Sequence, residues 1–165
     1  MTAAEQIVAA RDQLNRTLAF FSRVDAKASV VLAVDTSMLA VLTAKLSSLN
    51  TLRWEWIPIA LAFALLGASL WNVHQEAFPA LEGGEESLLY FREVAKLTEA
   101  NYIAKWMKTD ETEHLRDLLG QVWRNSCILT KKFNHIRLAI NFLMAAIVPW
   151  LVSVAWLWNA TTAAK

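Results

Sequence analysis

One apolar run limits what this chain can fold into. Residues 28–44 are seventeen mostly apolar residues in a row, and the charged tripeptide Asp25-Ala26-Lys27 stands just before them. A helix rises about 1.5 Å per residue, so the run would measure roughly 26 Å, close to a bilayer core of about 30 Å. The run therefore predicts a first transmembrane helix over residues 28–44.

A carboxylate, Asp35, lies near the middle of this run. Placing it at that depth costs about 2.5–3.5 kcal/mol on insertion scales, so the side chain should face protein or water rather than lipid. Three interpretations stay open: Asp35 is bonded to hydroxyls such as those of Thr36 or Ser37, desolvation keeps it protonated, or it lines a cation path. The cost of a buried acid favours a functional role.

Two further apolar runs, residues 57–73 and 138–158, predict a second and a third transmembrane helix. Apolar residues make up 56% of the chain, above the roughly 45–50% of soluble domains. Most of the eight tryptophans lie beside or near the ends of apolar runs, as in the interfacial belts of membrane proteins: Trp54, Trp56, Trp71, Trp150, Trp156 and Trp158. The chain is therefore expected to be integral to a membrane.

The residues between the first two runs predict a tight connection. Residues 45–55 are short, polar and rich in turn-forming side chains, and Pro58 stands in the first turn of the second helix, where proline is tolerated. The first two runs thus predict a transmembrane hairpin. In the third run, Pro149 should bend the helix or leave a carbonyl free to bond a neighbour.

Lysine and arginine are distributed unevenly around the three runs. Four precede the first run, two lie between the first and second, nine lie between His74 and Arg137, and one ends the chain at Lys165. The positive-inside rule therefore places residues 1–27 and 74–137 in the cytoplasm and the carboxyl terminus outside. Charges spread along the first 27 residues are unlike a signal peptide, so no cleavage is expected.

The first 27 residues predict an amphipathic cytoplasmic helix. Apolar or small residues recur at every seventh position in two series, Ile7, Leu14 and Phe21 and, beside them, Ala10, Thr17 and Val24. This spacing places both series on one helix face. No glycine or proline interrupts the pattern, so the helix should continue directly into the first apolar run.

Residues 74–137 predict the rest of the cytoplasmic part. Pro79 and the pair Gly83-Gly84 should break the helix that leaves the membrane, and apolar spacing then predicts a helix from Glu85 to Trp106. Asp110 can cap a further helix, and Glu113, three residues on, can complete a capping box.

That last helix should run without interruption into the third apolar run. Its apolar positions recur every seventh residue, with a second series four residues later: Leu115, Val122, Leu129, Ile136 and Leu143, then Leu119, Ser126, Phe133, Ile140 and Ile147. The spacing predicts a coiled-coil-like seam that keeps one face across the membrane boundary.

The predicted fold class is an all-α integral membrane protein. Three cytoplasmic helices of about 22 to 27 residues, roughly 33–40 Å each, would form a three-helix stalk continuous with three transmembrane helices. About 80 soluble residues make a small core, so self-association through the stalk is expected to add stability.

Catalytic and metal-binding patterns do not occur in the sequence. His74, His114 and His135 are scattered, and there is no HExxH, GxSxG, Walker or GxGxxG pattern. A formal net charge of +1 gives no reason to expect nucleic acid binding, and the single cysteine, Cys127, fits a small residue on a helix. We therefore expect no enzyme, no metal site and no cofactor.

The element Asp25-Ala26-Lys27-Ala28-Ser29 is a more specific signal at the membrane boundary. Side chains two positions apart on a helix are separated by about 200° of rotation around its axis, so Asp25 and Lys27 point to opposite sides. One can face the helix bundle while the other reaches the headgroups, and Ser29 can share the face of Asp25. The plainer interpretation is an ordinary interfacial boundary.

The order of these elements resembles the transmembrane effectors of Pycsar anti-phage systems, the PycTM family. The resemblance covers essentially the whole chain: RVDAKASVVLAVDTSML, a second apolar run, SLLYFREVAKLTEANYIAKWM followed by LRDLLGQVWRNSCILTKKFNHIRLAI, and a last apolar run. The D-x-K-A-S element is its most specific part, and Lys132-Phe133 resembles the lysine–aromatic dipeptide that ends the family's soluble helix. At Asp35 the family more often has a neutral polar residue.

The resemblance implies an effector held idle in the bacterial inner membrane, with its amino terminus cytoplasmic and its carboxyl terminus periplasmic. When an infected cell makes cyclic UMP or cyclic CMP through a pyrimidine cyclase, such an effector disrupts the membrane and arrests or kills the host. A cyclic nucleotide needs a cation for its phosphate and a stacking surface and polar partners for its base. The sequence offers Asn101, Tyr102, Arg116, Trp123, Arg124 and Asn125.

Two other functions stay open. A membrane-anchored adaptor subunit that docks a cytoplasmic partner would form a stable hetero-complex and leave permeability unchanged. A small cation channel lined by Asp35 would change its conductance when Asp35 is replaced by Asn.

Overall fold

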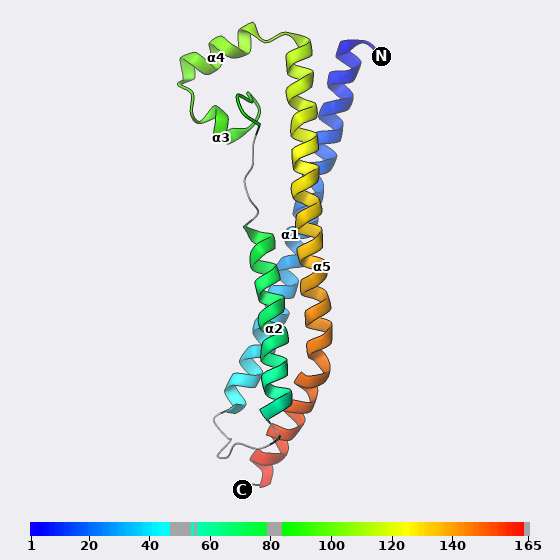
Figure 1. Cartoon of the computed structure of the whole chain (residues 1–165), viewed down its shortest axis with the longest axis vertical. Helices are drawn as coiled ribbons and strands as arrows, with labels where there is room; N and C mark the ends of the chain where they lie inside the picture. The colour runs from blue at the N-terminus through cyan, green and yellow to red at the C-terminus, as the bar shows by residue number, and fades with distance from the viewer. Residues whose placement is uncertain (47–53, 55, 79–83, 164–165) are drawn as a thin grey trace. The chain divides into compact units, whose positions relative to one another are not determined.

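All the regular secondary structure in the described part of the chain is helical. A computed structural model describes residues 1–46, 54, 56–78 and 84–163. Its helices, labelled in Figure 1, are α1 (Ala3–Leu46), α2 (Trp56–Ala77), α3 (Phe91–Val94), α4 (Glu99–Lys108) and α5 (Glu111–Ala163). The predicted all-α fold class is confirmed.

Three helices are long and apolar enough to cross a membrane. They contain the candidate spans Ala3–Ala44, Trp56–Ala77 and Glu111–Asn159, which correspond to α1, α2 and α5. Each carries an 18-residue window with few charges, the composition that a bilayer core requires. The chain is therefore described as a multi-pass membrane protein, as the three apolar runs predicted.

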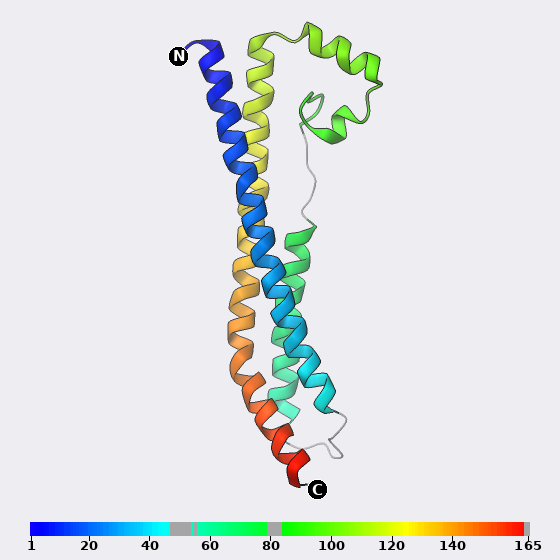
Figure 2. The same cartoon turned by 180° about the vertical axis from the view of Figure 1, so that it is seen from behind.

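The chain divides into two compact units. Unit 1 consists of Met1–Arg23 and Pro79–Lys131, and unit 2 consists of Val24–Phe78 and Lys132–Lys165. The helices α1 and α5 contribute residues to both units. Within unit 1 their segments run side by side in both views (Figures 1 and 2).

Unit 2 has a core formed by α1, α2 and α5. Its fully buried members come from all three helices: Leu42, Ile59, Ala62, Leu66, Ala146 and Leu157. Small side chains such as Ala62 and Ala146 allow helices in a membrane to approach closely. The indole Nε1 of Trp150 donates a hydrogen bond of 3.0 Å to the carbonyl of Met38, which ties α5 to α1.

The apolar stripe predicted for α1 is confirmed. Ala10, Thr17 and Val24 are buried, and the neighbouring series at Ile7, Leu14 and Phe21 is partly buried.

The seam predicted for α5 is right in its first series and wrong in its second. Ile136 is buried and the other members of that series are partly buried, but Leu119, Phe133 and Ile140 are exposed. The second buried series stands three residues after the first instead of four: Leu118, Lys132, Ala139 and Ala146. Helical neighbours on one face alternate between steps of three and four, and the prediction chose the wrong step.

The single helix predicted from Glu85 to Trp106 is wrong. The structure has the short α3 and the ten-residue α4 there, so the prediction of three helices of similar length is also wrong. Ser87 Oγ accepts the backbone N–H groups of Leu89 and Tyr90 at 3.2 and 3.0 Å, which holds a turn in place of helix. Thr98 then caps α4 by accepting the N–H of Asn101 at 3.3 Å.

The other predicted helix boundaries have mixed outcomes. Asp110 Oδ1 accepts the N–H of Glu113 at 2.7 Å, so the predicted cap of α5 is confirmed. Pro58 lies in the first turn of α2, as expected. The predicted breakers Pro79 and Gly83, and most of the turn over 45–55, lie outside the described residues.

Pro149 lies inside α5, and the helix bends in its orange to red part (Figure 1). The hydroxyl of Ser153, one turn later, donates to the Pro149 carbonyl at 2.6 Å. This hydrogen bond satisfies a buried hydroxyl within the helix itself.

Candidate functional site

A buried lysine joins three helices in unit 2. Lys132 Nζ on α5 donates to Asp25 Oδ1 on α1 at 2.7 Å and to Glu76 Oε1 on α2 at 2.8 Å. The side chains of Lys132 and Glu76 are only 8% and 2% exposed, whereas that of Asp25 is 56% exposed. We call these three residues the boundary cluster, because they flank the predicted spans.

The boundary cluster holds two negative groups around one positive group. Lys132 precedes the predicted third span; burial by itself lowers the pKa of its ammonium, but hydrogen bonds to Asp25 and Glu76 outweigh burial and raise that pKa. Lys132 is therefore charged. Removing the ammonium would leave Glu76 buried without its partner, the situation in which buried ion pairs are most costly to break.

Adjacent residues of α5 contact the two charged residues of the D-x-K-A-S element. Lys132 pairs with Asp25, and the next residue, Phe133, has the Lys27 ammonium 5.8 Å from its ring centroid, within the range of a cation–π contact. Asp25 and Lys27 thus contact different residues of the same helix, and that one of them reaches the headgroups stays a prediction.

The last two residues of the element have structural contacts. Ala28 is buried. The Ser29 hydroxyl donates to the backbone carbonyl of Asp25 at 2.9 Å, so Ser29 contacts the backbone of Asp25 and not its carboxylate.

Asp35 is fully buried between helices. Its Oδ2 accepts the hydroxyl of Ser69 on α2 at 2.6 Å. The hydroxyls of Thr36 and Ser37 instead bond carbonyls of α1 itself, at 2.8 and 2.7 Å. Of the three interpretations left open, a hydroxyl partner is present, but it comes from another helix and not from the neighbours of Asp35 in sequence.

The hydroxyl of Ser69 lies within hydrogen-bonding distance of two acceptors. It is 2.6 Å from Asp35 Oδ2 and 3.0 Å from the carbonyl of Ala139 on α5. One hydroxyl proton serves one acceptor. Both contacts become hydrogen bonds if Asp35 is protonated and donates to Ser69 Oγ, while Ser69 donates to the carbonyl of Ala139.

Sequence reasoning missed Glu76 and Ser69, although the sequence contains a signal for both. The buried positions of α2 alternate in steps of three and four: Ile59, Ala62, Leu66, Ser69, Val73 and Glu76. Extending the apolar seam by its own spacing therefore reaches both polar residues. A charged residue in register with an apolar seam requires a partner, and Lys132 is in register with Ala139 and Ala146 on α5.

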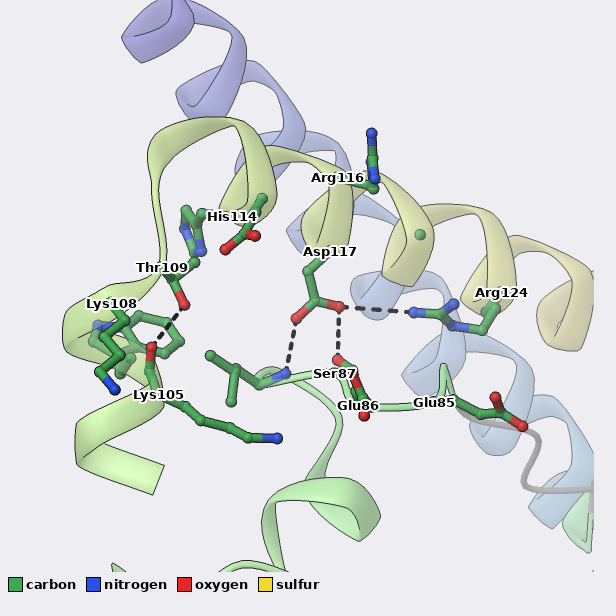
Figure 3. A pocket seen from close by; sticks show the side chains of 14 residues that line it. Glu85, Glu86, Ser87, Lys105, Lys108, Thr109, His114, Arg116, Asp117 and Arg124 are labelled. Carbon is green, nitrogen blue, oxygen red and sulfur yellow. Dashed lines mark hydrogen bonds and ion pairs between the residues drawn. The ribbon is translucent and has the colours of Figure 1, made fainter. Parts of the chain in front are cut away.

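Unit 1 contains a cavity of about 800 Å³ (Figure 3). Its lining comes from residues 85–88, from residues 105–109 at the end of α4, and from residues 113–124 of α5. Asp117 fixes one wall, because its carboxylate accepts the Ser87 hydroxyl at 2.7 Å and the Leu88 N–H at 3.0 Å. Gln121 Nε2 adds a bond of 3.0 Å to Ser87 Oγ.

Of the residues predicted to bind a nucleotide, Arg116 and Arg124 line this cavity. Tyr102 does not line it but contacts Trp106, which does, with ring centroids 6.1 Å apart. Asn101, Trp123 and Asn125 are not among the lining residues; Trp123 is 68% exposed, and Asn125 bonds the carbonyl of Gln121. Trp106, His114 and Lys105 line the cavity and were not predicted.

Among the described residues no group of three or more His, Cys, Asp or Glu side chains is arranged to hold a metal ion. Cys127 is half-buried and forms no disulfide.

Comparison with known protein families matches residues 9–159 to the Pycsar effector protein domain, PycTM. Comparisons with curated proteins and with solved structures found no match. The matched range includes the boundary cluster, Lys27 with Phe133, and the cavity of unit 1. The resemblance based on the D-x-K-A-S element is thus confirmed, and the chain belongs to the PycTM family of Pycsar anti-phage effectors with transmembrane helices.

Proposed function

We propose that this protein is a non-enzymatic effector of the bacterial inner membrane that senses cyclic UMP or cyclic CMP during phage infection. On binding the nucleotide it disrupts the membrane and arrests or kills the infected cell. The nucleotide would come from a pyrimidine cyclase of the same defence system. The amino terminus and residues 74–137 are cytoplasmic and the carboxyl terminus is periplasmic, which the distribution of lysine and arginine supports.

One structural observation supports the proposal in addition to family membership. The most specific element of the family resemblance, Asp25 with Lys27, is paired residue by residue with Lys132 and Phe133, and these contacts join helices that can span a membrane. A largely buried cluster of ion pairs can act as a switch if it exchanges this arrangement of its pairs for another. We therefore assign the control of membrane disruption to these contacts.

A ligand can drive such a switch only if it binds the two states with different affinity. The helices α1 and α5 are continuous and carry residues of both units, so a change in helix packing can be passed along each helix. In the idle state the boundary cluster would hold the spans together. In the active state those ion pairs would be exchanged for others or for water.

Self-association is part of the proposal, because a single unit 1 leaves several apolar side chains uncovered. Val8, Leu18 and Phe20 on α1 are 58%, 47% and 42% exposed, and Leu119 and Trp123 on α5 are also exposed. Contact between copies would remove this surface from water. Cross-linking in native membranes would detect the oligomer. A protein that stays monomeric at the expression level that arrests cells would contradict self-association.

Single substitutions at the D-x-K-A-S element test the proposal in cells. Cells that express the protein are supplied with cyclic UMP or cyclic CMP, and dye influx and membrane potential are followed. Wild-type protein and the control Lys131→Ala, at an exposed site beside the cluster, should respond. Asp25→Ala and Lys27→Ala should lose the response at normal membrane expression. No response of the wild type to either nucleotide would reject the trigger; full activity of both variants would reject the switch.

A further inference from the structure

We infer that the cavity of unit 1 is the ligand site, in which Arg124 binds the phosphate of a cyclic nucleoside monophosphate and Trp106 stacks on its base. The inference rests on the proposed function for the class of ligand. It adds where the ligand binds and which groups recognise it. The argument depends on the space around Arg124, on its hydrogen bonds, and on the other groups that line the cavity.

The space around the Arg124 guanidinium exists because two nearby residues are glycines. A Cβ atom built on Gly84 would collide with the guanidinium, and one on Gly120 would lie 3.1 Å from its nearest nitrogen. Gly84 comes from the segment before α3 and Gly120 from α5. The two glycines thus form a slot in which the head of Arg124 lies.

The guanidinium of Arg124 has five N–H donors. The carboxylate oxygen Asp117 Oδ1 lies 3.8 Å from its Nη2, too far for a hydrogen bond. Asp117 is already bonded by Ser87 and Leu88, which fixes its position. In the described part of the chain Arg124 Nε is buried with no hydrogen-bond partner. A guanidinium held in this way has donors left for an anion.

The other lining residues indicate what kind of anion fits. Lys105 reaches into the space below Asp117 (Figure 3), and the Trp106 ring provides an aromatic surface. The volume of about 800 Å³ is in the usual range for small-molecule sites. Arg124 and Trp106 thus give the same cavity a cation for a phosphate and an aromatic surface for a base.

The charged side chains that line the cavity balance. Four are carboxylates, Glu85, Glu86, Glu113 and Asp117, and four are cationic, Lys105, Lys108, Arg116 and Arg124. Because this lining has no surplus of positive charge, a cyclic phosphodiester with one negative charge should be accommodated more readily than a 5′-monophosphate, which carries up to two.

Equilibrium binding to the purified full-length protein in nanodiscs tests the inference. The probes are labelled cyclic UMP and cyclic CMP, with 5′-UMP and inorganic phosphate as competitors. The wild type should bind at least one cyclic nucleotide and prefer it to 5′-UMP and to phosphate. Arg124→Gln and Gly84→Ala should each weaken binding about tenfold or more, since a hydrogen bond to a charged group is lost or displaced.

Two further variants separate recognition from folding. Arg124→Lys keeps the charge and should bind better than Arg124→Gln, while the control Arg11→Gln, an exposed arginine on α1, should bind like wild type. Trp106→Leu should weaken cyclic nucleotide binding but leave competition by phosphate unchanged. Helical circular dichroism of each variant should match the wild type.

The outcomes distinguish this inference from the proposed function. If the wild type binds a cyclic nucleotide and Arg124→Gln and Gly84→Ala bind it equally well, the site lies elsewhere and the inference is wrong, while the proposed function stands. If the wild type binds neither cyclic nucleotide, both are wrong. Phosphate binding that is as strong as cyclic nucleotide binding would remove the role of Trp106 and with it the assignment of a nucleotide site.

Discussion

Lys132 differs from its neighbour Lys131 in one decisive respect, which is burial. Lys132 is buried between Asp25 and Glu76, whereas Lys131 is exposed to solvent. Lys132→Ala should destabilise the protein by about 3–5 kcal/mol, because it leaves the buried Glu76 unpaired. Lys131→Ala should change stability by no more than about 0.5 kcal/mol. Thermal unfolding of the detergent-solubilised protein would measure both.

A double variant checks the cause of that loss. Replacing both members of the buried pair, Glu76→Gln with Lys132→Met, removes the unpaired charge and should recover most of the stability. A double variant as unstable as Lys132→Ala would show that packing, and not charge, explains the effect.

Asp35 gives a second prediction at the scale of single residues. Asn has the shape of Asp and an N–H₂ group that can donate to Ser69 Oγ, as a protonated carboxyl would. Asp35→Asn should therefore keep both stability and the response to nucleotide, while Asp35→Ala should lose stability. Thermal unfolding measures the stability of both variants, and dye influx measures their response to nucleotide. Altered ion selectivity in Asp35→Asn would instead support the cation-channel alternative and contradict a structural, neutral Asp35.

At the scale of elements, the segment before α3 is held to α5 by one carboxylate. Asp117 bonds both the hydroxyl of Ser87 and the N–H of Leu88. Asp117→Ala should therefore speed amide hydrogen exchange at residues 87–90 and leave α2 unchanged. Glu113→Ala, which changes an exposed carboxylate one turn earlier on α5, is the matched control. Unchanged exchange in Asp117→Ala would mean that this segment is held by other contacts.

The long helices could be predicted from the sequence, and the short ones could not. Apolar spacing identified α1, α2 and α5, because a helix that buries one face leaves a periodic pattern along its own sequence. The break at Ser87 depends on Asp117 and Gln121, about 30 residues later, and local pattern does not reveal such bonds. The cap at Thr98 could have been predicted from the sequence, because Thr followed by Glu in the first turn is a typical helix start.

In the candidate site, too, single residues could be chosen from the local sequence, but contacts between residues far apart in the chain could not be predicted. Asp25 and Lys27 could be chosen from sequence because a charged element stands next to an apolar run. Local pattern could not pair them with Lys132 and Phe133, because both of these partners lie on α5, far along the chain. Arg124 was selected for its charge alone; the slot between Gly84 and Gly120 that holds it depends on the three-dimensional fold.

For the whole molecule, the proposed ligand site lies in unit 1 and the apolar core lies in unit 2, and α1 and α5 contribute residues to both units. The family match covers residues 9–159 and so includes both units almost completely. If the proposed function holds, the purified chain alone should disrupt a membrane, whereas an adaptor subunit would act only through its partner.

Dye release from liposomes that contain only the purified protein tests whether this chain itself disrupts a membrane in response to the nucleotide. The liposomes carry a self-quenching dye, and nucleotide is added outside, where it reaches the copies whose residues 74–137 face outward. We predict release on addition of cyclic UMP or cyclic CMP, and none with cyclic AMP or with the Lys27→Ala variant. Intact liposomes in the presence of both pyrimidine nucleotides, or equal release without any nucleotide, would contradict the account.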